Sequence, residues 1–87
     1  MAGGSELREI INKMLHDPRE DPSRYTFYVV DRGEPSQLRE VRGDEIEGVE
    51  RGFLRVYGAE IPLHRVVRVV RDGEVIWERG RRAPGGR

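Results

Sequence analysis

The N-terminal part of the chain has the apolar spacing of an amphipathic helix. The apolar residues that recur every three or four positions are Leu7, Ile10, Ile11, Met14 and Leu15. This period places them on one face of an α-helix. Ser5 precedes them as a predicted N-cap, and Asp17-Pro18 should end the helix because the residue before a proline avoids helical dihedral angles. We therefore expect about three helical turns whose apolar face packs on a sheet.

After the helix, the chain changes to short segments of β-branched and aromatic residues separated by turn residues. The predicted strands are residues 25–31, 38–42 and 53–57. Between the second and the third, Asp44 is predicted to cap a single helical turn. Together with a C-terminal hairpin, this order predicts an α+β fold, with the N-terminal helix packed on a curved antiparallel sheet of about four or five strands. A small open barrel is the alternative architecture.

The C-terminal part of the chain predicts a β-hairpin at the centre of this sheet. Two β-branched runs flank Asp72-Gly73, and Asp-Gly favours the type I′ turn, which needs positive φ at both central residues. If no bulge interrupts the pairing, this turn places Val69 opposite Ile76 and Arg68 opposite Trp77. The hairpin therefore carries histidine, arginine and the only tryptophan close together.

Composition and charge indicate one small domain with an ionic surface. The chain has 87 residues, of which 36% are hydrophobic and 37% charged. We assign residues 5–79 to a single domain and expect residues 80–87, which lack an apolar anchor, to form a disordered basic tail. The formal net charge is zero, but residues 61–87 contain seven arginines against three acids. This local excess favours a phosphate-bearing partner and is too small for a general nucleic-acid patch.

The residue types and motifs that are missing narrow the range of functions. The sequence has no cysteine, which excludes a disulfide or a zinc–cysteine framework. It has neither an apolar signal core nor a run of membrane-spanning length, and we expect a cytoplasmic protein that does not bind membranes. A Walker loop, a dinucleotide-binding glycine motif and a cluster of metal-ligating carboxylates are also missing. We therefore expect no cofactor and no metal site, and we assign no catalytic residue.

Two short polar motifs stand where strands are expected to end or begin. Asp31-Arg32-Gly33 closes the first predicted strand, either as an ordinary turn or as a site where Arg32 grips a phosphate and Asp31 aligns its guanidinium. His64 and Arg65 stand just before the hairpin. His64 either satisfies a backbone carbonyl or acts as a phosphate-binding or acid/base group, since the usual pKa of imidazole near ~6.5 allows both roles.

The predicted pair of Arg68 and Trp77 is the third candidate for binding. A cation–π contact between them would cover the sheet and contribute about 0.5 to 1 kcal/mol at an exposed site. Alternatively, the Trp77 ring is a platform on which an RNA base stacks. Both interpretations depend on the register of the hairpin.

A family resemblance rests on the order of several motifs. In chain order these are Leu15-His16-Asp17-Pro18-Arg19, Asp21-Pro22, Tyr25 to Val30, Asp31-Arg32-Gly33, Ile61-Pro62-Leu63-His64-Arg65-Val66 and Val75-Ile76-Trp77-Glu78-Arg79. Over roughly residues 5–79 this order resembles a small, largely archaeal uncharacterised family that is also described as the RNA cyclic group end recognition domain. The resemblance implies binding of RNA ends that carry a 2′,3′-cyclic phosphate.

The resemblance also indicates which residues and partners to consider. By position, the candidate polar residues are Asp31, Arg32, His64 and Arg65. Leu63 departs from the family pattern, since we expect an aromatic residue there in similar sequences. In eukaryotes similar domains accompany phosphoesterase or nucleotidyltransferase modules, which implies RNA-processing proteins as partners.

Three functional hypotheses follow. The first is a non-enzymatic RNA-binding module in which arginines and His64 hold a terminal phosphate and an exposed aromatic ring stacks the last base. The second is a phosphoesterase that opens cyclic phosphates, a reaction that usually needs two positioned acid/base groups, whereas the chain has only His64 and a remote His16. The third is a protein-interaction module whose hairpin edge pairs with another chain.

Overall fold

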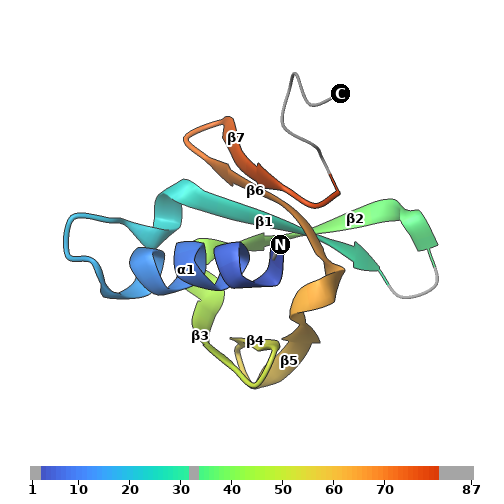
Figure 1. Ribbon diagram of the computed structural model, residues 1–87, viewed down its shortest axis with the longest axis horizontal. Helices are drawn as coiled ribbons and strands as arrows, with labels where there is room; N and C mark the ends of the chain where they lie inside the picture. The colour runs from blue at the N-terminus through green and yellow to red at the C-terminus, as the bar shows by residue number, and fades with distance from the viewer. Residues whose placement is uncertain (1–2, 32–33, 81–87) are drawn as a thin grey trace.

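One helix and two antiparallel sheets make up the structure. The computed structural model describes residues 3–31 and 34–80. The elements in chain order are α1 (Gly3–His16), the 3₁₀ turn η1 (Pro22–Arg24), β1 (Tyr25–Asp31), β2 (Glu34–Arg42), the 3₁₀ turn η2 (Gly43–Glu45), β3 (Ile46–Glu50), β4 (Phe53–Val56), β5 (Ala59–Pro62), the 3₁₀ turn η3 (Leu63–Arg65), β6 (Val66–Arg71) and β7 (Glu74–Glu78) (Figure 1). The predicted tail lies, apart from Gly80, outside the described residues.

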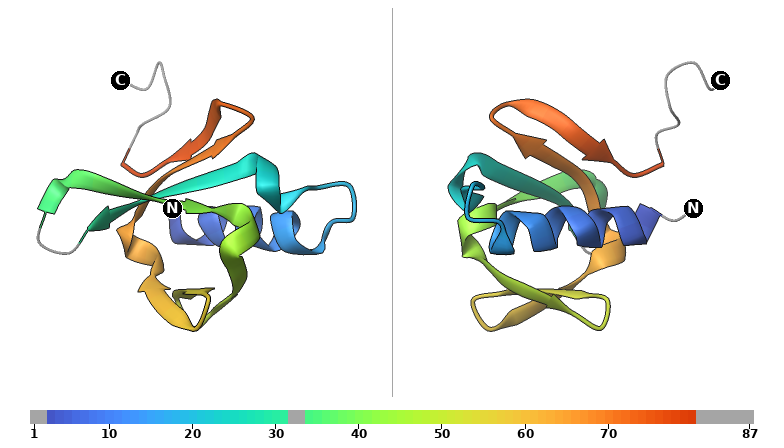
Figure 2. Two further views of the ribbon diagram at one scale, coloured as in Figure 1. Left: turned by 180° about the vertical axis from the view of Figure 1, so that it is seen from behind. Right: turned by 60° about the vertical axis from the view of Figure 1, so that its left-hand side comes forward.

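The strands pair in the orders β2-β1-β6-β7 and β3-β4-β5. The predicted α+β fold is confirmed, and the main sheet has four strands, within the expected range. The described strands do not curl into one barrel, because β3, β4 and β5 form a separate sheet. Figure 2 shows α1 lying against the main sheet with the small sheet beside both, and η3 connecting the two sheets.

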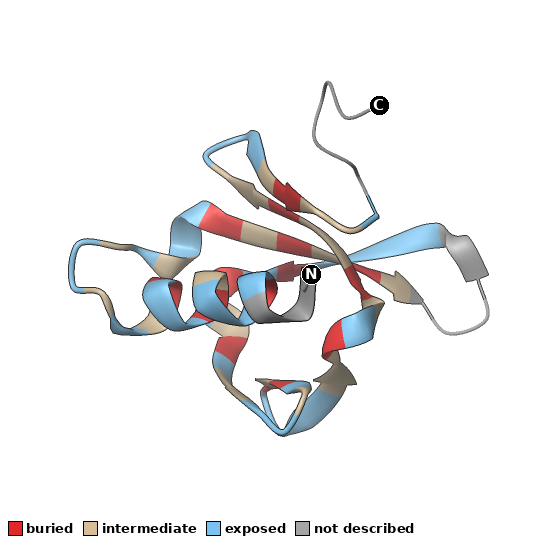
Figure 3. Cartoon of the chain, in the orientation of Figure 1, coloured by how far each residue is buried: buried red, intermediate tan, exposed pale blue. Residues whose placement is uncertain are grey.

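A single core joins the helix to both sheets. Helix α1 contributes Leu7, Ile11 and Met14, each at most 1% exposed. These side chains belong to the same cluster as apolar residues of β1, β6 and β4. Figure 3 shows the buried positions recurring along α1 and the central strands β1 and β6. The apolar face of α1 therefore packs into the core, as the spacing of its residues predicts.

The helix boundaries differ from the prediction at one end only. The helix begins at Gly3, so Ser5 lies inside it and is not its N-cap. It ends at His16, directly before Asp17-Pro18, as expected. The carboxylate of Asp17 then accepts a 2.9 Å hydrogen bond from the backbone N–H of Arg19, which fixes the turn that leaves the helix.

Of the small sheet, only the strand at residues 53–57 was predicted, which corresponds to β4. Strands β3 and β5 were missed because the hairpin turns that join them to β4 lack the usual sequence signal. The β3–β4 turn has Arg51 and Gly52 at φ values of 53° and 79°, and the β4–β5 turn has Tyr57 and Gly58 at 47° and 82°. Type I′ turns usually carry Asn or Asp at the first of these positions. The Asp72-Gly73 turn has the same φ pattern and was predicted for that reason.

Two shorter segments also differ from the predictions. Asp44 does not cap η2, which has Arg42 at its N-cap position without a side-chain capping bond. Instead, the Asp44 carboxylate accepts a hydrogen bond from Arg42 at 3.1 Å. His64 and Arg65 lie in η3 and not on a strand, since β6 begins only at Val66.

A bulge in the β6–β7 hairpin changes the predicted register. Val69 pairs with Trp77 and Val70 with Val75, so Ile76 is the extra residue on β7. The predicted pairs of Val69 with Ile76 and of Arg68 with Trp77 are therefore wrong. A bulge shifts every side chain beyond it to the other face of the strand. Trp77 consequently faces the core and is 7% exposed.

Candidate functional site

The end of β1 and the turn η3 lie at the same end of the main sheet. Strand β1 runs antiparallel to β6 with Val29 opposite Val66. The last residues of β1 therefore lie beside η3, the segment just before β6. This brings the neighbourhood of Asp31 close to that of His64 and Arg65, although Arg32 and the side chain of Asp31 lie outside the described part of the structure.

A hollow of about 190 Å³ lies between β1, β2, β5 and η3. It is lined by Val29, Val30, Arg39, Ala59, Glu60, Ile61, Pro62 and Arg65. Its two guanidinium groups belong to residues that are 26 positions apart in the sequence, Arg39 on β2 and Arg65 in η3. Among the described residues, no ion pair joins either of them to a carboxylate. We call this feature the Arg39–Arg65 hollow.

Arg39 was not among the predicted site residues. The β1–β2 ladder places it opposite Val29, two residues before β1 ends at Asp31. Residues opposite one another in a ladder project from the same face of the sheet. Arg39 therefore shares its face with the buried Val29 at the rim of the core. Strand β5, which the sequence pattern does not predict, supplies four further lining residues of the hollow.

The guanidinium of Arg79 holds η3 in place. Its Nε donates a 2.8 Å hydrogen bond to the carbonyl of Val66, and its Nη2 donates a 2.9 Å bond to the carbonyl of Leu63. The same group lies 5.1 Å from the centre of the Trp77 ring, a cation–π contact. From the other side, the N–H of Leu63 donates a 2.9 Å bond to the carbonyl of Gly52 in the small sheet. The turn that carries His64 and Arg65 is thus tied to both sheets.

The residues of η3 differ in how far they are buried. Leu63 is 7% exposed and belongs to the core, so it anchors the turn. Arg65 is half-buried beside the hollow, and His64 is exposed. The turn therefore presents one cation to the hollow and an imidazole to solvent.

Arg68 and Trp77 do not line this hollow. The predicted contact between them is absent, because each has another partner. The Arg68 guanidinium lies 5.6 Å from the centre of the Tyr28 ring and pairs with Glu78 at 3.2 Å. The Trp77 ring is buried and carries the Arg79 guanidinium on it. The tryptophan therefore fills the core, and Arg79 replaces Arg68 as its cationic partner.

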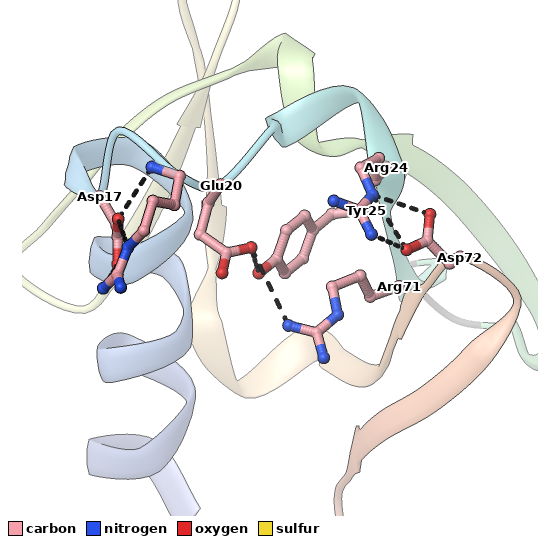
Figure 4. Close-up of polar contacts among 7 residues, drawn as sticks. Asp17, Glu20, Arg24, Tyr25, Arg71 and Asp72 are labelled. Carbon is pink, nitrogen blue, oxygen red and sulfur yellow. Dashed lines mark hydrogen bonds and ion pairs between the residues drawn. The ribbon is translucent and has the colours of Figure 1, made fainter.

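A second polar cluster lies around the start of β1 and the β6–β7 turn (Figure 4). The Tyr25 hydroxyl donates a 2.7 Å hydrogen bond to Glu20, whose carboxylate lies 3.9 Å from Arg71. Arg24 pairs with Asp72, and this hydrogen bond lowers the pKa of the Asp72 carboxyl. Burial raises the pKa of the Tyr25 phenol, and its bond to Glu20 acts in the same direction. Because these cations already have partners, the cluster ties segments together and offers no open anion site.

The described residues contain neither a metal site nor a membrane-spanning helix. No group of three or more metal-ligating side chains occurs among residues 3–31 and 34–80. No helix in this part of the chain is long and apolar enough to span a membrane.

Fold and site together define a small α+β protein with an arginine-lined hollow where its two sheets meet. The chain belongs to the family described as the MJ1316 RNA cyclic group end recognition domain, whose profile matches residues 5–79. It is 65% identical over 74 residues to UPF0248 protein MK0350 of Methanopyrus kandleri, covering 85% of this chain and 100% of that protein.

Other archaeal relatives are more distant. A UPF0248 protein of Thermococcus gammatolerans is 36% identical over 77 residues, covering 87% of this chain and 92% of the relative. UPF0248 protein PH1212.1 of Pyrococcus horikoshii is 36% identical over 73 residues, covering 83% of this chain and 87% of that protein. Among solved structures, none matches the chain significantly.

Proposed function

We propose that this protein is a non-enzymatic module that binds RNA ends through a terminal phosphate, with the 2′,3′-cyclic phosphate as its ligand. The observation that carries the proposal is the meeting of Arg39 and Arg65 at one hollow, without a described ion-pair partner, in a family described by RNA cyclic group end recognition. Guanidinium groups are suited to phosphate because their planar donors match its oxygens.

The size of the hollow favours a terminal group over a stretch of backbone. Pockets that enclose a drug-sized ligand usually measure about 300 to 1,000 Å³, whereas this hollow has about 190 Å³. The protein also has a formal net charge of zero, so it attracts bulk RNA only weakly over long range. Affinity then depends on local contacts with the end group.

The proposed contacts come from strand ends and η3. Arg39 and Arg65 bind the phosphate oxygens, and His64 donates a further hydrogen bond from the rim of η3. Asp31 and Arg32 remain proposed members of the site because β1 ends beside η3. We leave out Arg68 and Trp77, since the first pairs with Glu78 and the second is buried.

The same geometry favours binding over catalysis. Opening a cyclic phosphate usually needs an acid and a base on either side of the phosphorus. His16 and His64 are the only histidines of the chain. His16 is the last residue of α1, and the C-terminal end of α1 lies on the opposite side of the molecule from η3 (Figures 1 and 2).

The test is a titration with short RNAs of one sequence that end in a 2′,3′-cyclic phosphate, a 3′-phosphate or a free hydroxyl. We expect the cyclic phosphate to bind most tightly. Arg39→Ala and Arg65→Ala should each weaken that binding by about 1.5 to 3 kcal/mol, the contribution of a charge-assisted hydrogen bond. Arg42→Ala is the matched control, because Arg42 lies on the same strand as Arg39 and already pairs with Asp44.

Two outcomes would contradict the proposal. Equal affinity for the three ends would favour the protein-interaction module instead. Conversion of the cyclic phosphate to a 2′- or 3′-phosphate by the purified protein would mean that it is a phosphoesterase.

A further inference from the structure

A second hollow adjoins the Arg39–Arg65 hollow on the outer face of the small sheet. It measures about 320 Å³ and is lined by Glu50, Arg51, Phe53 and Glu60. Glu60 lines both hollows, so the two are direct neighbours. We call the second one the Phe53 hollow.

Phe53 lies on the exposed face of β4, because side chains along a strand alternate between its two faces. Along β4, Leu54 and Val56 point into the core at 0% and 8% exposure, and Phe53 alternates with them at 39%. Its partner across the β4–β5 ladder is Pro62. Pro62 directly precedes η3, and η3 ends with Arg65.

A backbone hydrogen bond connects the small sheet to η3. The Gly52 carbonyl accepts the 2.9 Å hydrogen bond from Leu63 N–H, so the turn before Phe53 and the first residue of η3 are bonded to one another. The positive φ values of Arg51 and Gly52 define this tight turn. Phe53 and Arg65 therefore keep a set position relative to one another.

The charges of the two hollows differ in a way that orients a nucleotide. The Arg39–Arg65 hollow has two cations against one acid, Glu60. The Phe53 hollow is lined by two acids, Glu50 and Glu60, and one cation, Arg51, and Glu50 also pairs with Arg55 at 3.3 Å, so this hollow has no excess of positive charge. Carboxylates repel phosphate but accept hydrogen bonds from the amino groups of bases. The phosphate thus belongs in the first hollow and an uncharged aromatic base in the second.

We infer that Phe53 is the stacking residue for the terminal base of the RNA whose phosphate occupies the Arg39–Arg65 hollow. This inference rests on the proposed function and names the aromatic contact within it. Every base has a π-face, so stacking on Phe53 adds affinity with little dependence on sequence. Recognition of the end is then bipartite, with the phosphate held by arginines and the last base held by the small sheet.

The test compares two RNAs that both end in a 2′,3′-cyclic phosphate and differ only in whether the last nucleotide carries its base. The wild-type protein should bind the RNA with the base roughly fivefold to hundredfold more tightly. Phe53→Ala should abolish this preference without changing affinity for the RNA that lacks the base. Arg65→Ala should weaken the binding of both RNAs.

Two further variants separate stacking from a change of fold. Phe53→Trp should keep the preference, and its added fluorescence should be quenched when the base-bearing RNA binds. Tyr57→Ala removes an aromatic side chain that is 71% exposed at the other end of β4, and it should leave both affinities unchanged. Thermal melting of each variant shows whether it has folded.

The outcomes distinguish the two proposals. If Arg65→Ala weakens end binding and Phe53→Ala leaves the preference for the base intact, the inference about Phe53 is overturned and end recognition stands. If the wild-type protein binds neither RNA, the proposed function is overturned and the inference with it.

Discussion

The guanidinium of Arg79 donates a 2.9 Å hydrogen bond to the carbonyl oxygen of Leu63, a residue that lies 16 positions earlier in the chain. With its second bond, to the carbonyl of Val66, it binds the first residue of η3 and the first residue of β6, on either side of His64 and Arg65. Arg79 is thus a positioning residue for the turn that carries His64 and Arg65.

The first prediction follows from this contact. Arg79→Lys keeps the charge but loses the planar fork that reaches both carbonyls. We expect it to lower the free energy of unfolding by about 1 to 3 kcal/mol, the cost of leaving buried acceptors without a partner. It should also weaken the binding of RNA ends, since η3 is no longer held. Denaturant unfolding and the end-group titration measure the two effects, and an unchanged unfolding midpoint would contradict the assigned role.

The second prediction tests the bulge on β7. Trp77→Ala should cost about 3 to 5 kcal/mol, because the ring fills the core. Ile76→Ala should cost less, since Ile76 is the extra residue of the bulge and is only partly buried. Urea unfolding of both variants gives the comparison. A larger loss for Ile76→Ala would mean that the hairpin pairs without the bulge.

The third prediction concerns a close approach at Gly43. A Cβ atom there would lie 2.8 Å from Met14 Sδ and 2.9 Å from Tyr25 Cβ, and would also overlap the Pro22 carbonyl. Gly43→Ala should therefore destabilise the fold by about 1 to 3 kcal/mol, as overpacking of a core does.

Gly48→Ala is the matched control for this substitution. A Cβ atom at Gly48 would meet nothing within 4 Å, and its cost should be within about 0.5 kcal/mol of zero. Thermal melting of both variants compares the two sites. Equal melting temperatures for them would show that η2 does not pack tightly on α1.

The fourth prediction is a dependence of stability on pH. The hydrogen bond from Arg24 lowers the pKa of Asp72 in the folded protein. A lowered carboxyl pKa contributes stability above the unfolded value of about 3.9, and this contribution is lost as the pH falls through the folded pKa.

Asp72→Asn removes the titrating group and keeps a residue that suits a type I′ turn before Gly73. The variant should lose less stability than the wild type when the pH is lowered from about 6 to about 2. Urea midpoints across this range measure the difference. Parallel pH profiles for the two proteins would show that the Arg24–Asp72 pair does not contribute.

Local signals predicted a large part of this fold. The helical period of Leu7, Ile11 and Met14, the β-branched run of β1 and the Asp72-Gly73 turn each depend on neighbouring residues, so they can be recognised without the rest of the chain. In the small sheet only β4 was predicted, as a strand at residues 53–57. Its two hairpins were not recognised because Arg51-Gly52 and Tyr57-Gly58 are unusual residue pairs for type I′ turns.

The candidate site could be predicted only in part, for a physical reason. His64 and Arg65 stood out as polar residues beside a predicted strand, and the family resemblance pointed to them. Arg39 and Phe53 did not, because their places depend on how β2 and β5 come together around η3. The orientation of Trp77 depends on a bulge, which forms where packing on the core outweighs regular pairing along the ladder. The outcome depends on contacts between residues that are far apart in the sequence, and these contacts form only when the sheets pack. The helical period and the turn residues, in contrast, depend on residues within a few positions of one another.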